Sequence, residues 1–215
     1  MIIDHVGQFF FPQSVFLRAI GRLSFPLFAW LIANGAYYTK NINKYLVRIG
    51  VLAVISQVPY FFANRLLDPD FSKLNVLFTL FLGALAIKLL KNKRLFVRFF
   101  ALIIVFVALK WKMSFGLQGI VSIIAFYFFF NKPAVMMVAQ IVIYSSKYLF
   151  YTLLLGPFSL LAVALQHNFF EPLALFSLPI ITLYNGKKGG GYKYFFYLFY
   201  PLQYVFYYLV KLLIS

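Results

Sequence analysis

An acid and a base stand side by side near the start of the chain, where Asp4 and His5 interrupt the apolar segment MIIDHVG. An ionisable side chain within an apolar segment costs free energy, so each of the two is a candidate functional group. Consecutive helical residues project about 100° apart, so each needs a partner from another helix. The alternative is that both side chains are simply solvated at a surface. The sequence leaves these two interpretations evenly balanced.

Arg18 and Arg22 are the natural partners for this pair. Their i, i+4 spacing places both on one helix face, and Pro26 follows Arg22 by four residues, where it can kink or open the helix. The alternative is a pair of surface arginines whose stems lie along apolar surface while their charged ends reach water. We favour the functional role, with Asp4, His5, Arg18 and Arg22 as the candidate catalytic residues.

A basic, glycine-rich stretch, YNGKKGGGYK, covers residues 184–193. Glycines permit positive φ and close backbone approach, and free N–H groups beside lysines can bind an anion such as the phosphates of a cofactor. The pattern is neither GxGxxG nor a P-loop, and taken alone it favours a flexible basic cytoplasmic loop by about two to one. The candidate cofactor-binding residues are Tyr184, Asn185, Gly186, Lys187, Lys188 and Lys193.

The composition is that of a membrane protein. Of the 215 residues, 64% are hydrophobic and 11% are charged, whereas a soluble domain has about 45–50% apolar and about 25% charged residues. Such a chain cannot cover itself with polar surface, but a lipid bilayer accepts an apolar exterior. Cysteine is absent, and two His and four acids leave few metal ligands, so we expect neither thiol chemistry nor a metal site.

Apolar runs approaching the ~20 residues of a bilayer span recur along the whole chain. They cover residues 1–12, 24–39, 45–64, 74–90, 95–110, 115–130, 134–155, 170–184 and 193–213. These runs predict an all-α, polytopic transmembrane helix bundle of eight to nine spans, in a single domain over residues 1–215. The run before Pro12 is too short to cross ~30 Å, so we expect the first span either to be truncated, which is the simpler interpretation, or to enter the bilayer only halfway.

Basic residues alternate along the chain in a way that predicts its orientation. The second, fourth, sixth and eighth connections and their flanks hold twelve of the 20 Lys and Arg and none of the four acids. The positive-inside rule places these connections in the cytoplasm of a multi-pass cell-membrane protein. The formal charge of +16 is therefore explained by a lipid bilayer as partner, and nucleic acid is not expected.

Several of these stretches together resemble the TraX family, membrane proteins named for conjugal-pilin acetylation. They are IDHVG at 3–7, RAIGRLSFPLFAWLIANG at 18–35, YLVRIGVLAVISQVPY at 45–60, LNVLFTLFLG at 74–83, LYNGKKG at 183–189 and FFYLFYPLQ at 195–203. Their order matches that of the family and they cover nearly the whole chain. The family resembles multispan acyltransferases, which move an acyl group from cytoplasmic acyl-CoA to an acceptor at the far face.

The resemblance implies a role for each candidate residue. His5 becomes the general base or acyl carrier beside Asp4, and Arg22 matches the arginine of the GRLSFP motif. Residues 184–188 match the family's YNGxRG-like loop and would hold the phosphates of acetyl-CoA, although Lys188 replaces an arginine and loses its bidentate geometry. Two further departures are Gln203, which replaces a histidine, and the segment KMSFGLQG at 112–119, which lacks a customary acid.

The function implied is acetyl transfer from cytoplasmic acetyl-CoA to a protein N-terminus, a cell-wall polymer or a lipid-linked glycan at the outer face. A transporter or flippase of a small anionic or lipid-linked solute is the main alternative, and inverted repeats would favour it. A third interpretation is a non-catalytic family member, to which Gln203 gives weight.

Overall fold

The computed structural model describes residues 1–155, 171–187 and 193–214, and its regular elements in these ranges are all helices. They are α1 (Ile2–Phe10), α2 (Val15–Arg22), α3 (Ser24–Tyr38), α4 (Ile42–Arg65), α5 (Val76–Leu90), α6 (Leu95–Lys110), α7 (Gly116–Phe128), α8 (Pro133–Leu155), the 3-10 helix η1 (Glu171–Phe176), α10 (Ser177–Thr182) and α11 (Lys193–Ile214). The predicted all-α class is confirmed for this part of the chain.

Three of the described helices are long and apolar enough to cross a membrane: Val15–Tyr38, Ile42–Arg65 and Tyr197–Ile214. Shorter apolar helices lie between them, so the structure supports a multi-pass membrane protein, while the total of eight to nine spans stays a prediction. The second span differs from the expected 24–39, because Leu23 keeps an αR backbone and joins α2 to α3. Arg18 and Arg22 therefore lie within this helix rather than ahead of it.

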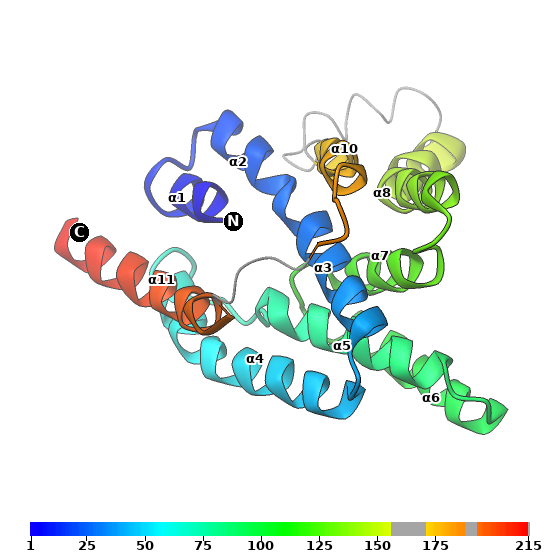
Figure 1. Cartoon of the computed structure of the whole chain (residues 1–215). Helices are drawn as coiled ribbons and strands as arrows, with labels where there is room; N and C mark the ends of the chain where they lie inside the picture. The colour runs from blue at the N-terminus through cyan, green and yellow to red at the C-terminus, as the bar shows by residue number, and fades with distance from the viewer. Residues whose placement is uncertain (156–170, 188–192, 215) are drawn as a thin grey trace.

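Helix α1 is too short to span a bilayer. Its nine residues extend about 14 Å at about 1.5 Å per residue, against a hydrocarbon core of about 30 Å. It packs against α2 and touches α11, and Phe9 is fully buried in the main core. Asp4 and His5 thus sit on a short helix that packs on α2 and touches the long α11 (Figure 1).

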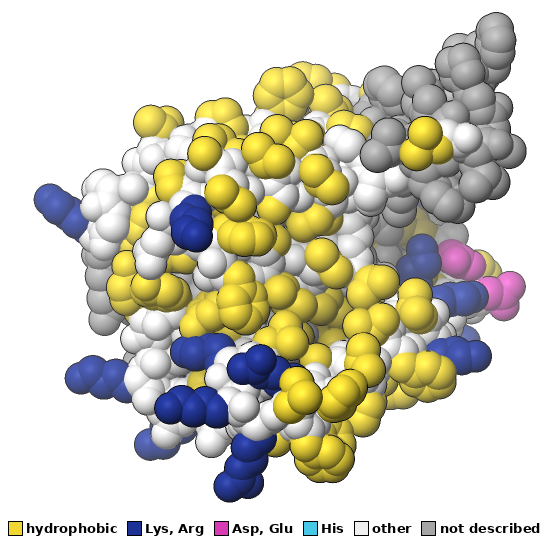
Figure 2. Space-filling view, turned by 90° about the vertical axis from the view of Figure 1, so that its right-hand side faces the viewer, with side chains coloured by type: hydrophobic (Ala, Val, Ile, Leu, Met, Phe, Trp, Pro, Cys, Tyr) yellow, Lys and Arg dark blue, Asp and Glu magenta, His cyan; other side chains and the backbone are white. Residues whose placement is uncertain are grey.

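The connections between helices separate toward opposite ends of the bundle. In Figure 1 the α3–α4 and α5–α6 connections lie toward the lower right, whereas the α4–α5 connection lies at the left. The face shown in Figure 2 is largely apolar, with Lys and Arg side chains gathered in its lower part. Apolar side chains exposed between charged ends are what a bilayer requires, because lipid covers them without a free-energy cost.

The core that positions the site lies between α3, α5 and α7. Small residues allow these helices to approach closely: Ala29, Ala33 and Ala36 are buried on α3. At Gly83 on α5 a Cβ would press on Ile123, and at Gly119 on α7 it would overlap Phe25 and Thr79. Close packing of small residues is the main means by which helices associate in lipid.

A buried amide pair ties the start of α5 to the middle of α4. The Asn75 side chain caps α5 by accepting from the Leu77 N–H (2.9 Å), and its Nδ2 donates to the Ala53 carbonyl (2.9 Å). Gln57 Oε1 accepts from both the backbone N–H and Nδ2 of Asn75, and Gln57 Nε2 donates to the Lys73 carbonyl (3.1 Å). This network fixes the α4–α5 connection, which forms one wall of the site.

Replacing Asn75 by alanine should lower the free energy of unfolding by about 2–3 kcal/mol, because the helix cap and two buried hydrogen bonds are lost together. Denaturant or thermal unfolding of the purified protein in detergent measures the loss. Asn43→Ala is the matched control, since Asn43 is exposed in the first turn of α4. Equal stability of the two variants would show that the network does not hold this wall.

Candidate functional site

A cavity of about 720 Å³ opens where α1, α2, α4 and α11 meet the α4–α5 and α6–α7 connections. Asp4, His5, Arg18 and Arg22, the four residues proposed from the sequence for catalysis, all line it. Its other polar or aromatic lining residues include Gln8, Ser24, Tyr60, Asn64, Lys73, Lys112, Ser114, Phe115, Gln118, Tyr200 and Tyr204. The structure therefore brings together groups from both ends of the sequence.

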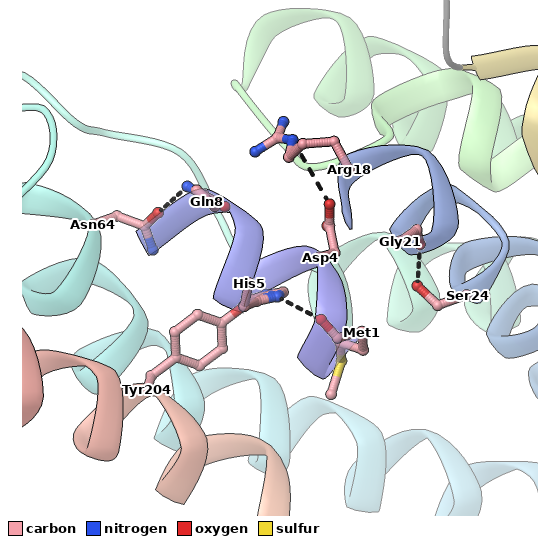
Figure 3. Close-up of polar contacts among 9 residues, drawn as sticks. All are labelled: Met1, Asp4, His5, Gln8, Arg18, Gly21, Ser24, Asn64 and Tyr204. Atoms are coloured by element: carbon pink, nitrogen blue, oxygen red, sulfur yellow. Dashed lines mark hydrogen bonds and ion pairs between the residues drawn. The ribbon is translucent and has the colours of Figure 1, made fainter. Parts of the chain in front are cut away.

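His5 is held between α1 and α11 by both ring nitrogens (Figure 3). Nδ1 lies 3.1 Å from the Met1 carbonyl, and Nε2 is in hydrogen-bond contact with the Tyr204 hydroxyl. A carbonyl only accepts, so the proton belongs on Nδ1 and the Nε2 lone pair accepts from Tyr204. The contacts thus assign the neutral tautomer that leaves Nε2 as the basic atom.

Burial keeps this imidazole neutral. Loss of solvation lowers the pKa of His5 to about 4, and the nearby Asp4 carboxylate opposes that shift without overcoming it. The rings of Tyr204 and Tyr207 pack against His5, with centroids at 4.9 Å and 6.1 Å. At neutral pH the ring is therefore uncharged and keeps its Nε2 lone pair, and the lowered pKa also makes it a weaker base than a solvated histidine.

Asp4 faces α2 rather than His5 (Figure 3). Its Oδ1 lies 3.8 Å from Arg18 Nε, and both side chains keep partial exposure. Gly21 permits this position, because a Cβ there would overlap the Asp4 side chain. The expectation that Asp4 and His5 take partners from other helices is thus met by the geometry: Arg18 for Asp4 and Tyr204 for His5.

Arg22 lies one turn beyond Arg18 and also lines the cavity. Its Nε is buried and has no hydrogen-bond partner within the described part of the protein. A buried donor without an acceptor costs free energy that a bound acceptor would restore. Asp4 Oδ1 and the Tyr200 hydroxyl are likewise buried in the lining without a hydrogen-bond partner among the described residues, and Arg22 is the cation among these three groups.

Two connections lie side by side to form the wall opposite α1. Leu74 and Met113 form an isolated parallel bridge: the Leu74 N–H donates to the Lys112 carbonyl (2.8 Å), and the Ser114 N–H to the Leu74 carbonyl (3.2 Å). Tyr60 shares a hydrogen bond with Ser114 Oγ (3.2 Å). Phe115, with φ 64°, turns the chain into α7 in a left-handed conformation that is uncommon for a non-glycine residue.

The basic loop proposed for cofactor phosphates is only partly described. Asn185 Oδ1 accepts from the Lys187 N–H (3.0 Å), Tyr184 donates to the Lys187 carbonyl (2.9 Å), and Gly186 has φ 74°. This turn uses the Lys187 amide internally and leaves its ammonium group exposed. Lys188 and the side chain of Lys193 lie outside the described residues, and none of the described loop residues lines the His5 cavity.

Tyr204 is the site residue that the sequence interpretation missed. Tyr200, Tyr204 and Tyr207 share one face of α11 by their i, i+4, i+7 spacing, and all three are buried. A tyrosine stripe within an apolar span was the available signal, because a buried hydroxyl needs a partner. Gln203, the departure noted from the family pattern, instead packs beside α1, with Nε2 3.8 Å from Met1 Sδ.

The chain is similar in sequence to a small set of known proteins. The TraX protein family matches it over residues 1–211. The probable fimbrial assembly protein FimC, serogroup H1, of Dichelobacter nodosus is 29% identical over 231 residues, covering 94% of this chain and 87% of that protein. An uncharacterized protein of Rickettsia prowazekii (strain Madrid E) is 29% identical over 92 residues, covering 43% of this chain and 34% of that protein. No solved structure matches significantly.

The resemblance drawn from the ordered motifs is thereby confirmed. The matched range contains α1 and almost all of α11, and so both partners of the His5–Tyr204 contact. The family match therefore covers every residue of the cavity.

Titration of His5 by NMR should have a midpoint near pH 4, because burial lowers its pKa. The folded chain then binds fewer protons than the unfolded chain below pH 6.5, so stability from this group is complete above pH 6.5 and is lost as pH falls toward 4. The resonance is assigned by His5→Gln. Tyr204→Phe should move the midpoint upward, since it removes a donor to the neutral ring. A midpoint near 6.5 in the unmodified protein would contradict this assignment.

Proposed function

We propose that this chain, which belongs to the TraX protein family, is an integral-membrane acyltransferase. It would move an acetyl group from cytoplasmic acetyl-CoA to an acceptor at the outer face of the cell membrane. The observation that carries the proposal is the neutral His5, whose Nε2 is held by the Tyr204 hydroxyl inside a cavity lined by arginines.

Acetyl-CoA, when bound, supplies a thioester whose acetyl carbon is open to attack by a hydroxyl or an amine. The residues of this chain then have to remove the proton of the attacking group. The Tyr204 hydroxyl already donates to His5 Nε2. When the Tyr204 oxygen accepts the proton of the attacking group, it can therefore release its own proton to Nε2. The reverse transfer returns a proton to the leaving thiolate, so that the base is regenerated.

The arginines and Asp4 have supporting roles in this proposal. Arg22 lines the cavity and has a buried Nε without a hydrogen-bond partner among the described residues, so its guanidinium can stabilise negative charge on a reacting oxygen or position the acceptor. Asp4 and Arg18 hold α1 on α2 through their ion pair, and so fix the place of the neighbouring His5. Direct acylation of His5 remains a second route, with Nε2 as the nucleophile.

The basic loop is the set of residues proposed to bind the phosphates of acetyl-CoA. The loop at 184–187, with Lys188 and Lys193 beyond it, offers an open turn at Gly186 and the exposed ammonium of Lys187. The hydrogen bond from the Lys187 amide to Asn185 removes one N–H from the predicted backbone cradle. In this proposal the loop therefore binds a phosphate mainly by the charge of its lysines and less by its backbone N–H groups.

The acceptor lies at the outer face in this proposal because the cavity lies at the end of the bundle that holds the third and fifth connections, opposite the basic connections assigned to the cytoplasm. Its walls come from the α4–α5 and α6–α7 connections, which the positive-inside rule places outside. A relative named for fimbrial assembly supports an acceptor that reaches or builds the cell surface. A protein N-terminus, a cell-wall polymer and a lipid-linked glycan all meet this condition.

His5→Gln should abolish acetyl transfer by the purified protein in lipid, because His5 is the one described imidazole that lines the cavity, and the Asp4 carboxylate there is paired with Arg18. Tyr204→Phe should lower kcat by about 10²-fold or more with little change in KM, since a positioned proton-transfer group contributes about 10²–10⁴-fold. The measurement is steady-state release of CoA together with mass spectrometry of acetylated products in membrane extracts.

Matched controls separate chemistry from folding. His167→Gln makes the same change at the other histidine of the chain. Tyr208→Phe makes it at a tyrosine of α11 that packs on Phe62 away from the cavity. Both controls should keep full activity, and undiminished turnover in His5→Gln would overturn the assignment.

A further inference from the structure

The cavity contains more positive charge than its own residues neutralise. Arg18, Arg22, Lys73 and Lys112 line it, whereas Asp4 is the one carboxylate among the described lining residues. Within the described ranges the one ion pair joins Arg18 to Asp4. Arg22, Lys73 and Lys112 therefore face the cavity without a carboxylate partner.

The general orientation of the chain does not explain this charge. Positive-inside topology concentrates Lys and Arg at the opposite, even-numbered connections, and predicts few cations where this cavity lies. Asp68 and Asp70 stand on the same connection as Lys73, but they are exposed, do not line the cavity and form no ion pair with Lys73. The positive cavity is thus a local feature that a ligand can explain.

The cations are arranged in depth. Arg22 lies within the cavity with a buried, unpartnered Nε, while Lys73 and Lys112 are exposed side chains. Their backbones are tied by the bridge between Leu74 and Met113, and Lys73 is also anchored by Gln57. Both lysines therefore line the same cavity as Arg22, from two connections whose backbones are tied together.

We infer that the acyl acceptor is a hydroxyl compound that carries a phosphate group, and that Arg22, Lys73 and Lys112 bind this phosphate. The inference rests on the proposed acetyl transfer and names its substrate class. The acceptor oxygen gains the acetyl group as its proton passes through Tyr204 to His5, and the thioester bond breaks to release CoA as a thiol. The products are an acetyl ester and free CoA.

A protein N-terminus fits this cavity less well than a phosphate ester. An α-amino group has a pKa near 8 and is mostly cationic at neutral pH, so it is repelled by the unpaired cations. A phosphate is attracted by them, and it can accept from Arg22 Nε. Lipid-linked glycans and phosphate-containing wall polymers share this chemistry, and it is the phosphate that the site is proposed to recognise.

Binding tests the inference without requiring turnover. Glycerol phosphate and phosphatidylglycerol are the soluble and the lipid probe, because each joins a phosphate to free hydroxyls; glycerol is the neutral probe. We expect calorimetry in uncharged detergent to show binding of at least one phosphate probe, weakened several-fold by raising the salt concentration, and no binding of glycerol. Absence of binding by both phosphate probes would overturn the inference.

Three variants locate the bound phosphate. The exposed pair Lys73→Gln and Lys112→Gln, made together, should weaken phosphate binding about tenfold without affecting folding, and Arg22→Gln should weaken it at least as much. Arg22→Lys should restore part of the affinity, because it keeps the charge. Lys132→Gln, at an exposed lysine of the α7–α8 connection, should leave affinity unchanged. Equal affinity in all variants would contradict the assigned site.

Parallel titration with CoA separates the acceptor from the donor. If the variants weaken CoA binding and neither phosphate probe binds, the cations serve the donor and the acceptor inference is wrong. If a phosphate probe binds at the cavity but acetyl-CoA is never consumed, the proposed function fails while the phosphate site stands. Acetylation of a peptide amine in preference to both phosphate probes would leave acetyl transfer intact and overturn the inference.

Discussion

The close contact between Asp4 and Gly21 is the constraint on which the site depends. Helix α1 has nine residues and is too short to be held by the membrane, so its position comes from packing. Glycine at 21 lets the Asp4 side chain lie directly on α2, where Arg18 meets it. That docking fixes the neighbouring His5 against Tyr204, more than 190 residues away along the chain. A larger side chain at 21 would displace the base rather than a peripheral residue.

A second constraint acts through the backbone of the two connections. Segments outside helices must still satisfy their polar groups, and here Leu74, Lys112 and Ser114 exchange backbone hydrogen bonds across the α4–α5 and α6–α7 connections. Asn75 and Gln57 continue this pairing into α4 and α5. The backbones of the two connections that carry Lys73 and Lys112 are therefore tied to each other and to α4 and α5.

The sequence predicted the class of fold because composition and apolar runs depend on local chemistry alone. It also singled out Asp4, His5, Arg18 and Arg22, because charged groups beside apolar runs cost free energy, and the structure places these four residues around one cavity. It could not place Tyr204 or Lys112, because their roles follow from which helices touch. The segment 112–119 was marked only for a missing acid, yet it forms a cavity wall. The continuous helix through Leu23 was missed because Ser24 and Pro26 are typical of a helix start.

The missing acid and the replaced histidine have a common physical interpretation. A carboxylate in the segment 112–119 would offset part of the positive charge of the cavity, to which Lys112 contributes. It would also weaken the binding of an anion by Arg22. Gln203 sits beside Met1, while the adjacent Tyr204 supplies a hydroxyl to His5. In the proposed transfer the proton path would therefore use one histidine and one tyrosine. The absent acid leaves the cavity more positive, and Gln203 leaves it with one histidine fewer. Neither departure removes a group that the proposed transfer requires.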